Sequence, residues 1–123
     1  MFVLKKILNG RINVSEPLYM TAAVDLKAGE AVKHGSAGTL VKVSADDTAE
    51  YVVLADAKAN EAVPVVLVTK EMLFDVDMAS AVTVGKKYQF ASTADGITTT
   101  AASTGFGACV MAYADKVATV RLA

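Results

Sequence analysis

Short runs of β-branched and aromatic residues, separated by Gly, Asn, Asp and Ser, are the feature of this sequence that most limits its fold. Such spacing is typical of an all-β barrel or sandwich and not of a helical bundle. The runs predict strands at residues 2–7, 31–33, 39–43, 51–55, 63–68, 72–76, 87–90, 97–100, 107–113 and 117–122. Glycines at residues 35–38 and 94–96 are expected to form tight reversals.

Helical structure is expected to be minor. Residues 44–50 and 77–81 could each form one helical turn, but neither segment is long enough to hold a helix without packing support. At 123 residues, the chain has room for one domain, with or without an arm. We therefore expect an all-β, compact barrel or sandwich with at most short helical turns.

The two halves of the chain repeat the same order of elements. In the first half, residues 26–32 precede a turn at Gly38 and then the runs 39–43, 51–55 and 63–68. In the second half, residues 82–88 precede a turn at Gly96 and then the runs 97–100, 107–113 and 117–122. This order predicts two similar strand units that close onto one another, each covering an apolar face of the other.

Residues 1–21 lie outside this repeat and are predicted to be an N-terminal arm or an edge strand, ahead of a β domain at residues 22–123. Apolar side chains of the arm must be buried somewhere, and a neighbouring subunit or another protein would serve. A simple first strand of the same barrel explains them equally well. The candidate contact residues are Phe2, Leu4, Ile7, Leu8 and Tyr19.

Charge and hydropathy argue against two classes of partner. Twelve basic and thirteen acidic residues give a net charge of -1, and neither sign forms a long block, so we expect no nucleic-acid binding. No stretch approaches the roughly 20 apolar residues that cross a bilayer, so we expect no membrane partner. Lys5 and Lys6 are not followed by an apolar region long enough for a signal peptide, and no secretion is expected.

Catalytic groups are scarce in the sequence. The single histidine, His34, is the usual type of proton carrier near neutral pH, and Ser36 with Asp46 or Asp47 would complete a triad. However, no serine lies in a Gly-x-Ser-x-Gly elbow. A solvated loop histidine is the better interpretation, and we predict no catalytic residues and no enzyme activity.

Metal and cofactor sites are also not expected. Cys109 is the only cysteine, and it reads as a small buried hydrophobe and not as a zinc ligand. The acidic residues at 46–50 and 75–77 lack the spacing of a calcium loop. The glycines at 105–107 lead into an apolar strand, where a phosphate-binding loop would lead into a helix. We therefore predict no metal and no cofactor.

The chain resembles the small capsid decoration, or cement, proteins of tailed bacteriophages over residues 22–123. In the second half, the resemblance lies in the segments 65–68, 71–76, 84–90, 95–100, 106–110 and 118–122, of which 84–90 reads Val-Gly-Lys-Lys-Tyr-Gln-Phe. In the first half, it lies in residues 27–32 followed by 38–41. In that family, similar segments form a strand, a glycine-containing entry to a barrel strand, a turn and a closing strand.

The resemblance implies a function that needs no catalysis. Proteins of this kind bind the outside of an assembled shell, often as trimers, and lock neighbouring capsomers together. The expected partners are the major capsid protein and further copies of this chain, and the expected location is the outer capsid surface of the virion, after synthesis in the host cytoplasm. A β-barrel of another virion part, such as a tail tube, fibre base or head-fibre adaptor, is the alternative. A barrel that binds a small ligand or carbohydrate is a third hypothesis.

Overall fold

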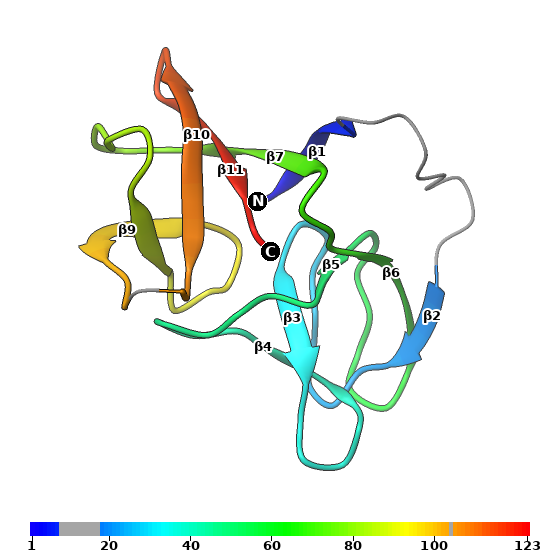
Figure 1. Ribbon diagram of the computed structural model, residues 1–123. Helices are drawn as coiled ribbons and strands as arrows, with labels where there is room; N and C mark the ends of the chain where they lie inside the picture. Colours follow the sequence, from blue (N-terminus) through cyan, green and yellow to red (C-terminus); the bar gives the residue numbers. More distant parts are fainter. Residues whose placement is uncertain (8–17, 104) are drawn as a thin grey trace.

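The structure, a computed structural model, describes residues 1–7, 18–103 and 105–123 and is all-β (Figure 1). Its strands are β1 (Val3–Ile7), β2 (Leu18–Thr21), β3 (Ala31–His34), β4 (Leu40–Lys42), β5 (Tyr51–Val53), β6 (Ala62–Leu67), β7 (Met72–Asp77), β8 (Lys87–Phe90), β9 (Ile97–Ala101), β10 (Ala108–Ala114) and β11 (Val117–Arg121). Among these residues, no helix is long and apolar enough to cross a membrane.

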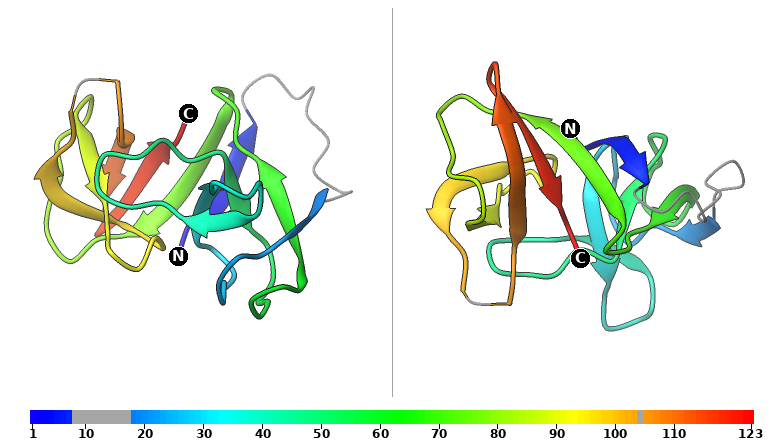
Figure 2. Two further views of the ribbon diagram at one scale, coloured as in Figure 1. Left: turned by 90° about the horizontal axis from the view of Figure 1, so that it is seen from below. Right: turned by 45° about the horizontal axis from the view of Figure 1, so that its top comes forward.

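The strands form two antiparallel sheets that pack as a sandwich and do not close into a barrel. One sheet has the order β1-β7-β11-β10-β8-β9, and the other has the order β2-β6-β5-β3-β4. Two further views show the strands of the two sheets on opposite sides of the molecule (Figure 2). The predicted all-β class is therefore confirmed, and of the two predicted architectures the structure has the sandwich.

The predicted internal repeat is confirmed by the strand order. The first repeat, residues 18–67, pairs its strands as β2-β6-β5-β3-β4, and the second repeat, residues 72–121, pairs its strands as β7-β11-β10-β8-β9. If the five strands of each repeat are numbered along the chain, both repeats have the order first, fifth, fourth, second, third. The chain thus contains one five-stranded unit twice, and β2 belongs to the first unit.

Each repeat also contains an equivalent backbone hydrogen bond outside its strands. Gly29 N–H donates to the carbonyl of Val53 at 2.8 Å, and Gly85 N–H donates to the carbonyl of Val110 at 2.7 Å. Both glycines have a left-handed backbone, with φ of 84° and 90°. Equivalent positions can therefore be compared residue by residue between the repeats.

Each repeat encloses apolar side chains. The smaller core lies inside the first repeat and consists of Ala22, Leu26, Val32, Leu40, Val53, Val63 and Val65. The larger core contains their counterparts in the second repeat, Met78, Val82, Tyr88, Ile97, Val110, Ala118 and Val120. It also contains the residues that join the repeats, among them Phe2, Ala31, Val52, Val66 and Phe74. Strands β3, β5 and β6 of the five-stranded sheet therefore have buried side chains on both faces.

β1 is the additional strand outside the repeat. It pairs antiparallel with β7, with Val3 opposite Asp75 and Ile7 opposite Met72, and forms one edge of the six-stranded sheet. Lys5 Nζ lies 3.7 Å from the Asp75 carboxylate. The N-terminal segment, as far as residue 7, is thus an edge strand of the domain.

Three local features differ from the sequence-based expectations. β2 was not predicted, because Leu18–Thr21 was taken as part of the arm. The possible helical turns at residues 44–50 and 77–81 are not helical. In the second hairpin turn the left-handed residue is Ala94, with φ of 62°, and not Gly96. Ala94 is the counterpart of Gly38, whose φ is 79°, so backbone geometry is kept where the residue type is not.

Candidate interaction surface

Exposed apolar side chains converge where β1 passes over the first repeat. Met1 is 58% exposed, Val3 is 52% exposed and Leu54 is 45% exposed. All three line one pocket of about 160 Å³, whose other walls include the buried side chains of Val66 and Phe74. Large apolar groups left in water at one place mark interaction sites more often than singly scattered ones do.

β2 extends this apolar region across the five-stranded sheet. Tyr19 lies opposite Pro64 on β6, and Leu54 N–H donates to the Pro64 carbonyl at 2.9 Å. Residues directly opposite each other in an antiparallel sheet project from the same face. Tyr19, Pro64 and Leu54 therefore form one row, in which Tyr19 is 69% exposed. We call Met1, Val3, Tyr19, Leu54 and Pro64 the N-terminal apolar surface.

The residues predicted to make contacts differ in how exposed their side chains are. Phe2 is only 2% exposed, and its ring packs edge-to-face on Phe90 with centroids 6.0 Å apart. Leu4 and Ile7 are half-buried and pack against the larger core. Of the predicted residues that the structure describes, Tyr19 is the one that is mostly exposed, and Leu8 lies outside the described residues. A contact role for these residues stays a prediction.

Sequence reasoning missed Met1, Val3 and Leu54. The available signal was strand alternation, since successive side chains of a strand point to opposite faces. With Phe2 buried, the exposed face of β1 carries Val3. The exposure of Leu54 had no such signal, because it depends on where β1 crosses the first repeat.

His34 lies at the end of β3, on the surface. Its Nδ1 is 2.8 Å from Oε2 of Glu50, and its ring meets Tyr51 edge-to-face with centroids 5.4 Å apart. The carboxylate beside the histidine is thus Glu50 and not Asp46 or Asp47. The pair is solvated, with about two-fifths of each side chain exposed.

The carboxylates of Asp46 and Asp47 accept hydrogen bonds that stabilise loops. The Asp46 carboxylate accepts hydrogen bonds from the Ser103 N–H at 3.1 Å and the Ser103 hydroxyl at 3.2 Å. Asp47 accepts the Ser44 N–H at 2.9 Å and pairs with Lys33 at 2.9 Å. Partial burial raises the pKa of Asp47, but the bonds from Lys33 and Ser44 outweigh it and hold the pKa below its usual value. Both aspartates therefore fasten the loop after β4.

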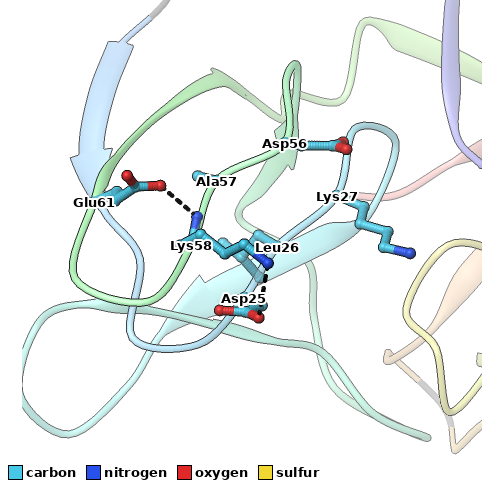
Figure 3. Close-up of a pocket in the computed structure, with 7 residues that line it drawn as sticks. All are labelled: Asp25, Leu26, Lys27, Asp56, Ala57, Lys58 and Glu61. Atoms are coloured by element: carbon cyan, nitrogen blue, oxygen red, sulfur yellow. Dashed lines mark hydrogen bonds and ion pairs between the residues drawn. The ribbon is translucent and has the colours of Figure 1, made fainter.

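A second pocket, of about 220 Å³, is lined by two loops of the same sequence pattern (Figure 3). Residues 25–30 read Asp-Leu-Lys-Ala-Gly-Glu, and residues 56–61 read Asp-Ala-Lys-Ala-Asn-Glu. The Asp25 carboxylate accepts the Ala59 N–H at 3.0 Å, and the Asp56 carboxylate accepts the Ala28 N–H at 2.9 Å. Each loop thus caps the other.

The remaining carboxylates of the two loops cap their own loop. Glu30 accepts the Lys27 N–H at 2.8 Å, and Glu61 accepts the Lys58 N–H at 2.7 Å. The hydrogen bond from Ala59, together with the charge of Lys58, holds the pKa of Asp25 below its usual value. These acids are occupied by backbone donors, so the pocket is a structural clasp. The spacing of the two Asp-x-Lys-Ala motifs was readable in the sequence and was missed.

Asp75 on β7 is also engaged. Asp75 accepts a hydrogen bond from the Thr119 hydroxyl at 2.7 Å, in addition to its ion pair with Lys5. Within the described ranges, no group of three or more His, Cys, Asp or Glu side chains is arranged to hold a metal ion.

Comparison with known proteins found no matching protein family and no matching curated protein.

Proposed function

We propose that this chain is a structural virion protein that binds the outer surface of an assembled phage capsid and stabilises contacts between capsomers. The observation that carries the proposal is the N-terminal apolar surface, where Met1, Val3 and Leu54 are each about half exposed around one pocket and Tyr19 extends the same face. The resemblance of residues 22–123 to capsid cement proteins supplies the capsid as the partner.

The architecture suits a protein that stabilises an assembled shell. The larger core joins the two repeats and contains both Phe2 and Leu122, so both ends of the described chain are fixed in the same apolar cluster. Attachment through an apolar surface supplies about 25 cal/mol for each Å² of apolar area removed from water, less the cost of ordering the partners. On a symmetric shell, many such contacts act together and give high avidity. The expected partners are the major capsid protein and further copies of this chain, with a trimer favoured.

Capsid binding by point variants tests the proposal. Expanded capsids that lack the protein are mixed with purified chain, and binding is measured by co-sedimentation and by survival of heat or osmotic shock. We expect wild-type protein to bind and protect, and Tyr19→Ser and Val3→Ser to weaken binding. Leu67→Ser is the matched control, because Leu67 is 49% exposed but lies outside the N-terminal apolar surface. Point variants are preferred to deletion of the first strand, which would remove Phe2 from the core.

Three outcomes would count against the proposal. Wild-type protein that neither binds nor protects capsids removes it altogether. A cryo-electron-microscopy map of the native particle with this chain in the tail or at a fibre base would instead support the alternative virion component. Equal loss of binding in Leu67→Ser would show that the N-terminal apolar surface is not the contact.

A further inference from the structure

The N-terminal residues of the chain occupy a receptor site on the first repeat. Phe2 N–H donates to the carbonyl of Gly29 at 2.8 Å. The Met1 side chain covers Gly29 so closely that a Cβ on the glycine would lie 2.5 Å from Met1 Cγ. Beside Gly29 runs a cross-strand row of Ala31, Val52 and Val66. These residues are 0%, 2% and 7% exposed, so the row is fully covered.

The second repeat contains the same site in an open form. Gly85 is the counterpart of Gly29, and a Cβ built on it meets no atom within 4 Å. Its flanking apolar residues, Val84 and Met111, are 58% and 42% exposed. Among the backbone hydrogen bonds of the described residues, none reaches the Gly85 carbonyl, the group that in the first repeat accepts the N-terminal bond.

The cross-strand row of the open site has different chemistry. Cys109 lies opposite both Lys87 and Arg121, in the places that Val52, Ala31 and Val66 take in the first repeat. All three side chains are half-exposed. In the described part of the chain, neither cation makes an ion pair, and the buried Nε of Arg121 has no hydrogen-bond acceptor. Lys86, next to Gly85, adds a further exposed positive charge.

We propose that the surface of Gly85, Val84, Met111, Lys87 and Arg121 is a docking site for an extended segment of a partner protein that carries apolar residues followed by acidic ones. The occupant of the first site sets the geometry: an apolar side chain lies over the glycine, and a backbone N–H donates to its carbonyl. The unpaired cations set the charge. The chain cannot fill this site with its own N-terminus, which is held at Gly29.

Charge distinguishes the two occupants. β1 carries Lys5, which pairs with Asp75 of the second repeat. At the open site, the neighbouring charges are Lys86, Lys87 and Arg121, so the same basic segment would be repelled there. An acidic side chain would form charge-assisted hydrogen bonds with the guanidinium or ammonium groups, which are stronger than bonds between neutral groups. The partner segment is therefore apolar and acidic.

Two labelled peptides test the proposal on the intact protein. One has the sequence of residues 1–7, Met-Phe-Val-Leu-Lys-Lys-Ile, and the other replaces both lysines with glutamate. We expect saturable binding of the acidic peptide by fluorescence anisotropy and at least about tenfold weaker binding of the basic one, as for a discrimination of roughly 1.4 kcal/mol. Binding of the acidic peptide should weaken as salt rises. Cys109, the only cysteine, reports occupancy through slower reaction with a thiol reagent.

Matched variants locate the site. Met111→Ser and Lys87→Glu should each weaken the acidic peptide at least about tenfold, whereas Leu67→Ser and Lys70→Glu should leave its affinity unchanged. The proposal is overturned by absence of saturable binding, by equal loss in the controls, or by a basic peptide that binds as well as the acidic one. It is also overturned if sedimentation shows self-association that protects Cys109 without peptide, because the occupant would then be a second copy of this chain.

Discussion

Replacing each repeat's left-handed glycine with alanine separates docking of the N-terminus from backbone strain. Gly29 and Gly85 have nearly the same φ, 84° and 90°, so a Cβ should cost a similar amount at both, about 1–2 kcal/mol. Only at Gly29 does the Cβ also meet atoms of Met1, at 2.5 Å from Cγ and 2.7 Å from Cβ. Relief of that overlap requires the N-terminal residues to move, which adds about 1–3 kcal/mol.

The free energy of unfolding should therefore fall by about 1–2 kcal/mol in Gly85→Ala and by about 2–5 kcal/mol in Gly29→Ala. Urea denaturation measures both. With a slope of roughly 1–3 kcal/mol/M, the two midpoints should differ by about 1 M. Amide hydrogen exchange provides the local test, because the amides of β1 should lose protection in Gly29→Ala and keep it in Gly85→Ala.

Gly38→Ala is the third member of the series. Gly38 has φ of 79° and open space around its Cβ position, so it should match Gly85→Ala. Equal losses at Gly29 and Gly85, or unchanged protection of β1 in Gly29→Ala, would refute the reasoning that Met1 is seated on the first repeat.

Three further perturbations test other parts of the structure. Because the pKa of Asp25 is lower in the folded chain than its usual 3.8, its contribution to stability is present above about pH 4 and is lost as the pH falls through the folded value. Asp25→Asn should therefore flatten the dependence of the urea midpoint on pH between about pH 2 and pH 6. Phe90→Ala should lower the free energy of unfolding by about 3–5 kcal/mol, since Phe90 is 2% exposed; a loss below about 1 kcal/mol in urea denaturation would contradict this placement. Tyr88→Phe should lower the free energy of unfolding by about 0.5–1.5 kcal/mol, because the Tyr88 hydroxyl accepts the Thr83 N–H at 2.8 Å; an unchanged urea midpoint would contradict a stabilising role for this hydrogen bond.

The parts of the fold that follow from local sequence were predictable. β-branched runs such as Val63 to Val68 must bury their side chains and have few alternatives to a strand, so the predicted strands and the repeated order of elements are both found. β2 was missed because Leu18–Thr21 lies before the repeated order of elements and was taken as part of the N-terminal arm. Its pairing with β6 is a long-range contact that no local pattern encodes.

The candidate surface was only partly predictable for the same reason. Sequence reasoning identified the N-terminal residues as an apolar group that needs a partner, but it could not tell which side chains meet the chain's own core. Phe2 and Val3 are neighbours in the sequence, yet one is 2% and the other 52% exposed. That division depends on β1 pairing with β7 while passing over Gly29 of the other repeat. Each of these contacts joins segments far apart in the sequence.

The two repeats have equivalent surfaces beside Gly29 and Gly85, but the single N-terminal strand covers only the one at Gly29. On the first repeat, the row of Ala31, Val52 and Val66 is apolar and enters the core, because β1 and the second repeat cover it. On the second repeat, the equivalent row is only partly covered, and aliphatic side chains in those places would form an exposed apolar patch. Lys87 and Arg121 stand in two of its three places and keep that face hydrated, while Gly85 and Met111 retain the receptor features of the covered site. Solubility alone would be served by polar residues throughout, so the retained open glycine beside exposed apolar groups is the feature that favours a docking site over a merely solvated face.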